Sequence, residues 1–208
     1  METCKYCGGK INKESINGVE VMVCVECGSL FVMIDGLREK TMQGCGVPEI
    51  FTSVKPAEKV ESLYIHGPNG TGKTTLAASC VRAAIDKGMS ALFVTEREMY
   101  ARFGDAMSGE GSESSVMSWL SSNDLLVIDD IGKRKPSLYS VSRLFDVVDE
   151  IYSRGSMLII TSNMSRGELM QRLSSCGDTF LASSIMSRIF EMTRTVHMDG
   201  PDRRLANG

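Results

Sequence analysis

The ten residues from His66 to Thr75, HGPNGTGKTT, constrain the fold more than any other part of this chain. They contain the pattern G-x-x-x-x-G-K-T, which is complete through the Lys-Thr pair. A short apolar stretch at 62–67 precedes the pattern, and a stretch with helical character at 73–87 follows it. A strand, a glycine-rich loop and a helix in this order are typical of a site that binds the phosphates of a nucleotide.

The residues of this loop have separate expected roles. Glycines allow the backbone N–H groups to face the phosphates, where the helix N-terminus adds a favourable field. Lys73 is expected to reach the β- and γ-phosphates, and the Thr74 hydroxyl to coordinate Mg²⁺. The expected nucleotide-binding residues are Gly67, Pro68, Asn69, Gly70, Thr71, Gly72, Lys73, Thr74 and Thr75.

Two further apolar stretches end in polar residues. The stretch LLVIDD at 125–130 predicts a strand from which Asp129 holds Mg²⁺ through water and Asp130 polarises the attacking water. The stretch MLIITSN at 157–163 ends in Asn163, which is placed either to contact the γ-phosphate or to form an ordinary polar turn. We find no N-K-x-D motif of the kind that selects guanine, so we predict that the nucleotide is ATP.

Apolar strands and helices alternate along the chain after residue 61, which predicts an α/β fold with a parallel sheet covered on both faces. The helix at 140–155 has an apolar face formed by Val141, Leu144, Phe145, Val148 and Ile151. The predicted strands are 62–67, 91–95, 125–130, 157–163 and 195–199. The other predicted helices are 73–87, 96–107, 116–122 and a stretch near 184–191, with a polar loop at 108–115.

Four segments together resemble the DnaC/IstB-like AAA+ ATPases, a family of replicative helicase loaders and transposase helper ATPases. They are GPNGTGKTTLA, ALFVTEREM, NDLLVIDDIGK and RLFDVVDEIYSRGSMLIITSNMSRGEL, and the resemblance covers about residues 60–204. It implies an AAA+ αβα sandwich with a five-stranded parallel sheet of order 5-1-4-3-2. It also places Asn163 at the position called sensor 1. Because the sequence stops at residue 208, we expect no C-terminal lid domain.

The resemblance assigns roles to two arginines near the end of the chain. Arg188 matches the arginine finger that reaches the nucleotide of a neighbouring subunit, although a solvated charge on a helix face is the structural alternative. Arg204 matches a sensor 2-like arginine that contacts the nucleotide, with Arg203 as the competing choice. The expected catalytic residues are Lys73, Asp129, Asp130, Asn163 and Arg188. Hydrolysis of ATP is therefore expected to depend on self-association or on a partner.

Two cysteine pairs precede the nucleotide motifs. Cys4-x-x-Cys7 and Cys24-x-x-Cys27 have the spacing of a four-cysteine Zn²⁺ site, and alternating valines before the second pair predict a short strand. Four thiolates complete a structural zinc site, although an iron–sulfur cluster or redox-active thiols are the alternatives. We therefore predict a zinc ribbon (1–33), a linker with a short helix around residues 37–42 (34–60) and an AAA+ ATPase domain (61–208). Mixed charge in the ribbon favours docking to a protein over contact with nucleic acid.

The chain has 208 residues and a net charge of −3, which excludes nucleic-acid coating through bulk positive charge. We see no secretory signal and no apolar run long enough to span a membrane, so we expect a cytoplasmic protein. Binding of single-stranded DNA would need a basic groove and stacking side chains, and solvated surface charge is the alternative interpretation of the candidates. The candidates for it are Lys133, Arg134, Lys135, Arg97, Tyr100, Arg102 and Phe103.

The function predicted from these features is that of an ATP-dependent helicase loader in DNA replication. It would bind the replicative helicase and single-stranded DNA, and ATP binding and hydrolysis would control assembly and release. One alternative is a transposase helper ATPase that binds duplex DNA. The other is an ATP-binding adaptor with little turnover, since Asp130 stands where glutamate is usual.

Overall fold

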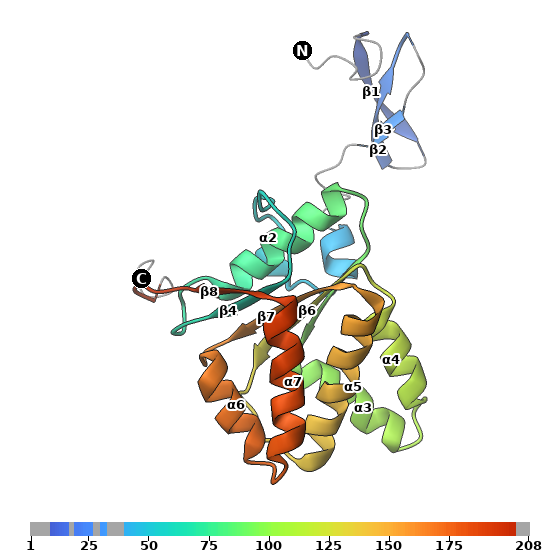
Figure 1. Ribbon diagram of the computed structural model, residues 1–208. Helices are drawn as coiled ribbons and strands as arrows, with labels where there is room; N and C mark the ends of the chain where they lie inside the picture. The colour runs from blue at the N-terminus through green and yellow to red at the C-terminus, as the bar shows by residue number, and fades with distance from the viewer. Residues whose placement is uncertain (1–8, 17–18, 27–29, 33–39, 203–208) are drawn as a thin grey trace.

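The computed structural model describes residues 9–16, 19–26, 30–32 and 40–202, which form two separate sheets (Figure 1). The N-terminal sheet is antiparallel in the order β1-β2-β3, and Ile11 pairs with Cys24. Its strands are β1 (Ile11–Ile16), β2 (Val19–Cys24) and β3 (Leu30–Val32). The strand predicted from the alternating valines is confirmed.

The second sheet has five parallel strands in the order β5-β6-β7-β4-β8. This is the order 5-1-4-3-2 read in reverse, so the predicted AAA+ αβα fold is confirmed. The carboxyl ends of β4, β6 and β7 lie side by side and bring the segments that follow them to one edge of the sheet. The strands are β4 (Leu63–His66), β5 (Ala91–Thr95), β6 (Leu125–Ile131), β7 (Met157–Ser162) and β8 (Arg194–His197).

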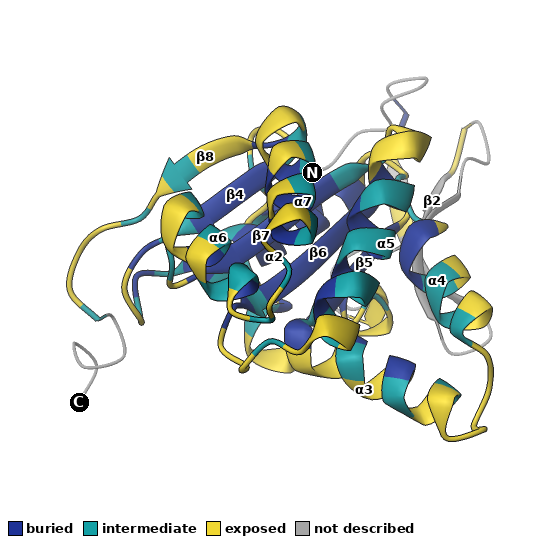
Figure 2. Cartoon of the chain, turned by 60° about the horizontal axis from the view of Figure 1, so that its bottom comes forward, coloured by how far each residue is buried: buried dark blue, intermediate teal, exposed yellow. Residues whose placement is uncertain are grey.

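Helices cover both faces of this sheet, with α2 on one face and α3 to α7 on the other (Figure 1). Alternate strand residues enter different cores, as the period of two requires. Leu63, Ile65 and Val127 pack with α2, whereas Tyr64 and Leu126 pack with α5 and its neighbours. Figure 2 shows the buried strands between these layers. The helices are α2 (Lys73–Asp86), α3 (Glu96–Met107), α4 (Glu113–Ser121), α5 (Leu138–Arg154), α6 (Arg166–Ser174) and α7 (Thr179–Met192).

Part of the segment predicted as a linker packs against the five-stranded sheet. Residues 40–44 are helical, a 3₁₀ turn η1 spans Glu49–Phe51, and Met42 and Val47 are buried in the core on the α2 side. The backbone N–H of Phe93 donates to the carbonyl of Cys45 (2.6 Å), which ties the segment to β5. Partly buried Phe51, Val54 and Val60 pack against the same core, so side chains from before the predicted boundary at residue 60 cover this face of the sheet.

Several helices begin earlier than predicted because polar residues cap them. Ser112 accepts a hydrogen bond from the backbone of Ser115, so α4 begins inside the predicted loop. Asp178 caps α7 in the same way, five residues or more before the stretch predicted as helical. Helix α6 was not predicted, although Ser165 and Glu168 form a capping box that indicates its start. Within the part of the chain that the structure describes, no helix combines the length and apolar character of a membrane span.

Candidate nucleotide site

The glycine-rich loop joins β4 to α2 at the carboxyl edge of the sheet. Gly67, Gly70 and Gly72 have φ angles of 146°, 75° and 97°, a region that residues with a Cβ rarely adopt. A Cβ on Gly67 would collide with the carbonyl oxygen of Met198, and one on Gly70 with the carboxylate of Asp202. Conformation therefore favours glycine at all three positions, and the Met198 backbone adds a steric requirement at Gly67.

Lys73 begins α2 and lies buried beneath the loop. Its Nζ donates hydrogen bonds to the carbonyl oxygens of Gly67 (2.8 Å) and Pro68 (2.7 Å). The Thr71 hydroxyl also donates to the carbonyl of Pro68 (3.0 Å). The ammonium group therefore lies inside the curve of the loop, where the phosphates of a nucleotide are expected to bind.

The carboxylate of Asp129 accepts hydrogen bonds from two hydroxyl groups. The Thr161 hydroxyl donates to its Oδ1 at 2.6 Å, and the Thr74 hydroxyl approaches its two oxygens at 3.1 and 3.3 Å. Asp129 is 5% exposed, and this burial raises the pKa of its carboxyl group, while the hydrogen bonds from Thr161 and Thr74 oppose the rise.

These oxygens fit a magnesium ion. Mg²⁺ takes oxygen ligands and usually keeps several waters. The Thr74 hydroxyl, 3.1 Å from Asp129 Oδ1, would coordinate the ion, and the Asp129 carboxylate would hold it through water. Among the described residues no group of three or more His, Cys, Asp or Glu forms a metal site, so phosphate oxygens and water would supply the remaining ligands.

Asp130 follows in a left-handed conformation, with φ of 64°, where the pairing of β6 with β7 shifts register. Its backbone N–H donates to the Thr161 hydroxyl (2.9 Å), which thereby connects both acidic residues. Its carboxylate pairs with Lys133 Nζ at 2.6 Å. The irregularity turns this side chain away from the sheet, into a hollow of about 580 Å³ that Arg97 and Arg134 also line.

Asn163 is exposed directly after β7, and the turn around it is anchored on both sides. The Ser162 hydroxyl donates to the carbonyl of Ile131 (2.8 Å) and accepts from the N–H of Met164 (3.1 Å). The Tyr64 hydroxyl donates to the carbonyl of Met164 (2.8 Å). These contacts were not predicted, because residues from three separate strands form them.

Arg188 lies near the opposite edge of the sheet. Helix α7 ends at Met192, and β8 begins at Arg194, which pairs with Leu63 at the amino end of β4. Arg188 is one turn before the end of α7, whereas the phosphate loop follows the carboxyl end of β4. The predicted finger and the predicted nucleotide loop are thus not brought together within one chain.

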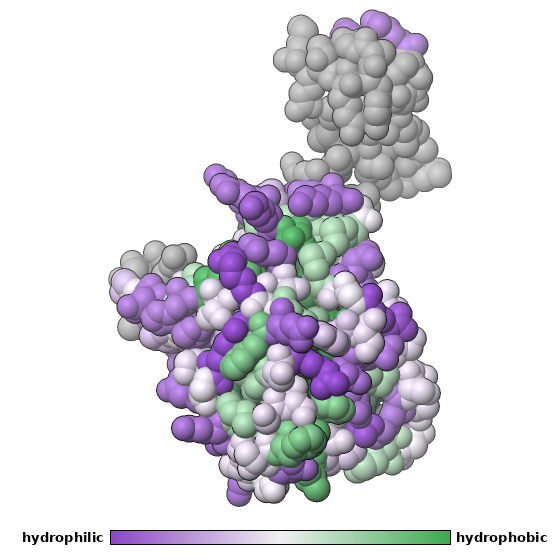
Figure 3. All heavy atoms as spheres, in the orientation of Figure 1, coloured by the Kyte–Doolittle hydropathy of each residue, from purple (hydrophilic) through white to green (hydrophobic). Residues whose placement is uncertain are grey.

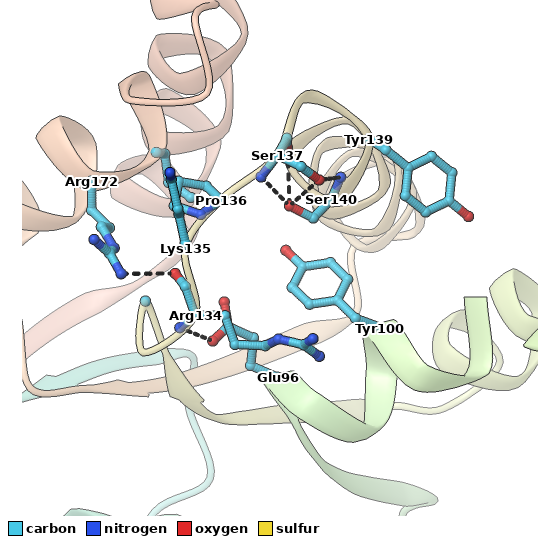
Figure 4. Close-up of a pocket in the computed structure, with 11 residues that line it drawn as sticks. Glu96, Tyr100, Arg134, Lys135, Pro136, Ser137, Tyr139, Ser140 and Arg172 are labelled. Carbon is cyan, nitrogen blue, oxygen red and sulfur yellow. Dashed lines mark hydrogen bonds between the residues drawn. The ribbon is translucent and has the colours of Figure 1, made fainter. Parts of the chain in front are cut away.

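The basic segment after β6 borders a cavity of about 210 Å³ (Figure 4). Glu96 is buried there, and its carboxylate faces the backbone N–H groups of residues 132–134. Burial raises the pKa of Glu96. Tyr100 points into the same cavity, and Phe103 is 0% exposed, so Phe103 is a core residue and not a surface for stacking bases. Arg102 instead lies over the ring of Trp119, 4.0 Å from its centre.

Several predicted residues lie outside the described residues. Arg203, Arg204, Cys4, Cys7 and Cys27 are among them, and Cys24 ends β2 without a described side chain. Zinc binding and the nucleotide contact of Arg204 therefore stay predictions.

Comparisons with known proteins place the sequence among ATP-binding proteins. A family model described as "IstB-like ATP binding protein" matches residues 49–208. The IS5376 putative ATP-binding protein of Geobacillus stearothermophilus is 29% identical over 148 residues, covering 71% of this chain and 57% of that protein. The replicative helicase loader DnaC of Escherichia coli K12 is 33% identical over 108 residues, covering 50% of this chain and 44% of that protein. The chain thus spans about half the length of these relatives.

Solved structures share the fold at lower identity. The crystal structure of DnaI gives a TM-score of 0.60 at 21% identity, covering 79% of this chain and 83% of that one. The crystal structure of the DnaC helicase loader gives 0.55 at 20% identity, covering 77% and 90%.

Proposed function

Because the chain belongs to the family of IstB-like ATP-binding proteins, we propose that it is an ATP-hydrolysing assembly switch that loads a replicative DNA helicase onto single-stranded DNA. ATP binding would join subunits and hold the helicase, and hydrolysis would release them.

The proposed hydrolysis uses residues from the carboxyl edge of the sheet. Lys73 would bind the β- and γ-phosphates, Thr74 would hold Mg²⁺ and Asp129 would hold it through water, and the ion would neutralise charge on the phosphates. Asp130 orients the attacking water, and Asn163 contacts the γ-phosphate or that water. Arg204, or Arg203 beside it, contacts the nucleotide. The irregular backbone at Asp130 supports this assignment, since it directs the carboxylate away from the buried Asp129.

The observation that carries the proposal is the separation of Arg188 from the phosphate loop across the sheet. If an arginine at the amino edge acts on a nucleotide, that nucleotide would belong to another subunit. Arginine fingers accelerate phosphoryl transfer about 10³- to 10⁵-fold, so turnover would follow assembly. In this proposal ATP binding promotes subunit association, and only associated subunits hydrolyse ATP at an appreciable rate.

The partner contacts rest on two other regions. Arg97, Lys133 and Arg134 line one hollow beside Asp130 and are proposed to contact the phosphates of single-stranded DNA. The 33% identity to a DnaC loader supports the helicase as partner. The N-terminal sheet is proposed to be a ribbon that binds Zn²⁺ through Cys4, Cys7, Cys24 and Cys27 and docks on the helicase.

A transposase helper ATPase is the second candidate. The similarity to an insertion-sequence ATP-binding protein extends over 148 residues, compared with 108 for DnaC. Such a protein would prefer duplex DNA. The ion pair of Asp130 with Lys133 supports a third candidate, an ATP-binding adaptor with little turnover, because it engages the proposed catalytic carboxylate.

The deciding experiment mixes the zinc-loaded chain with ATP and the replicative helicase of its own host, followed by size-exclusion chromatography with light scattering. We expect a co-complex that depends on ATP and is lost when residues 1–33 are deleted. Anisotropy with a fluorescent single strand and its duplex supplies the second arm. Absence of a co-complex together with preference for the duplex would overturn helicase loading in favour of the transposase helper.

A further inference from the structure

The Arg188 side chain is held by a stripe of three residues on α5. Its Nη2 atom pairs with Asp149 Oδ1 at 2.6 Å. Its guanidinium carbon lies 4.8 Å from the ring centre of Phe145 and 5.9 Å from that of Tyr152. Phe145, Asp149 and Tyr152 occupy positions i, i+4 and i+7, so they share one face of the helix.

We propose that Asp149 is a positioning residue that orients Arg188 for the nucleotide of a neighbouring subunit, an inference that rests on the proposed function. The rings of Phe145 and Tyr152 support the guanidinium group by cation–π contact, and the carboxylate fixes its rotation about that contact. Arg188 thereby reaches the subunit interface already oriented, and less entropy is lost when it meets the γ-phosphate.

Asp149 is the acidic residue available for this role. The other nearby acids have different partners: Glu191 accepts from the Tyr152 hydroxyl (2.8 Å), and Glu150 pairs with Arg154 (2.7 Å). Among the described residues, Asp149 is the only ionic partner that Arg188 has, and the Nε of Arg188 is buried without a hydrogen-bond partner. One carboxylate therefore determines the direction of the side chain.

An open hollow of about 390 Å³ adjoins Arg188, lined by Ser183, Ser184 and Ser187 along with Tyr152 and Glu191. Its hydroxyl groups and guanidinium can donate hydrogen bonds, and the Glu191 carboxylate accepts one from Tyr152. The surface over α7 mixes hydrophilic and hydrophobic side chains without one dominant apolar patch (Figure 3). This face therefore suits a polar contact with the nucleotide edge of another copy.

The first test is Asp149→Asn with Glu150→Gln as the matched control on the same helix. Both pairs are partly exposed, so both variants are expected to fold with the thermal midpoint of the wild type. Asp149→Asn should lower kcat about 10- to 100-fold with an unchanged KM for ATP, because a misplaced catalytic group costs rate and not ground-state binding. Glu150→Gln should stay within about twofold of the wild type. Equal loss in both variants would overturn the proposal.

The second test maps the defect to one side of the interface. Asp149→Asn subunits are mixed with Asp130→Asn subunits, which retain Arg188 and its support. We expect turnover to recover, because the intact nucleotide site of one variant meets the intact arginine of the other. Arg188→Ala should recover in the same mixture, and Asp149→Asn should add no loss to Arg188→Ala within one chain.

These outcomes separate the two proposals. If Arg188→Ala does not recover in the mixture, the trans-acting role of Arg188 fails. If Arg188→Ala recovers but Asp149→Asn alone has wild-type kcat, or its loss adds fully to that of Arg188→Ala, then the positioning role of Asp149 fails and the finger stands.

Discussion

The carboxyl edge of the sheet and the α5–α7 face differ in how they hold their functional groups. Asp129 is 5% exposed and is fixed by hydroxyl groups from α2 and β7. The Arg188 side chain is 28% exposed and is held by one carboxylate and two rings from a single helix. Asp129 is therefore held by groups from a helix and a paired strand, whereas Arg188 is held by side chains on the surface of one helix.

The difference matches the roles proposed for the two regions. Phosphates and Mg²⁺ require several groups at fixed positions, which neighbouring strand ends provide. An arginine that acts on another subunit must remain reachable from outside, which excludes deep burial. Because the arginine is exposed, its orientation depends on contacts with neighbouring side chains. Substitutions at the carboxyl edge should therefore change ATP binding, whereas substitutions on the α5–α7 face should change kcat.

The largest expected effect comes from Arg188→Ala. Loss of the finger should reduce kcat by about 10³-fold or more while the affinity for ATP stays within about twofold. Stopped-flow binding of a fluorescent ATP analogue and steady-state turnover measure the two quantities. A parallel loss of ATP affinity would contradict the separation of the two regions, since it would place Arg188 at its own nucleotide.

A smaller effect, on folding and ATP binding together, is expected for Gly67→Ala. The new methyl group would meet the Met198 carbonyl at a φ of 146°, so the exit of β8 must shift and the protein should lose about 2–3 kcal/mol of stability. Gly104→Ala is the control, because its Cβ meets nothing within 4 Å in α3. It should stabilise by about 0.5–1 kcal/mol. Urea unfolding of both variants measures the contrast, and equal midpoints would contradict it.

Prediction from sequence succeeded where local patterns determine structure. The five strands, their order and the joining of the loop to α2 follow from alternation, glycine spacing and family resemblance. The contacts of Thr161 with both acidic residues did not follow, because they connect strands more than 30 residues apart. Asp149 was not singled out either, since an acid on a helix resembles any solvated charge until α7 is placed against α5.

The smallest expected effect concerns the stability of the nucleotide-free protein. Burial raises the pKa of Asp129 above its ordinary value of 3.8, so the folded state binds this proton more readily than the unfolded state. The resulting penalty is absent well below pH 3.8 and grows as pH rises toward the folded pKa. Asp129→Asn should therefore stabilise the nucleotide-free chain at pH 7 relative to the wild type.

The same substitution should reverse its sign when MgATP is present. Wild type gains about 2.7 kcal/mol at a ligand concentration 100 times the dissociation constant, and the variant gains less because it lacks the magnesium carboxylate. Asp124→Asn is the control of opposite sign, since hydrogen bonds from Ser90 lower the pKa of Asp124 and its contribution is lost as pH falls. Urea midpoints at several pH values test both. If Asp129→Asn were destabilising without nucleotide at pH 7, the hydrogen bonds from Thr161 and Thr74 would stabilise the carboxylate by more than its burial destabilises it. The charged carboxylate would then not destabilise the nucleotide-free fold.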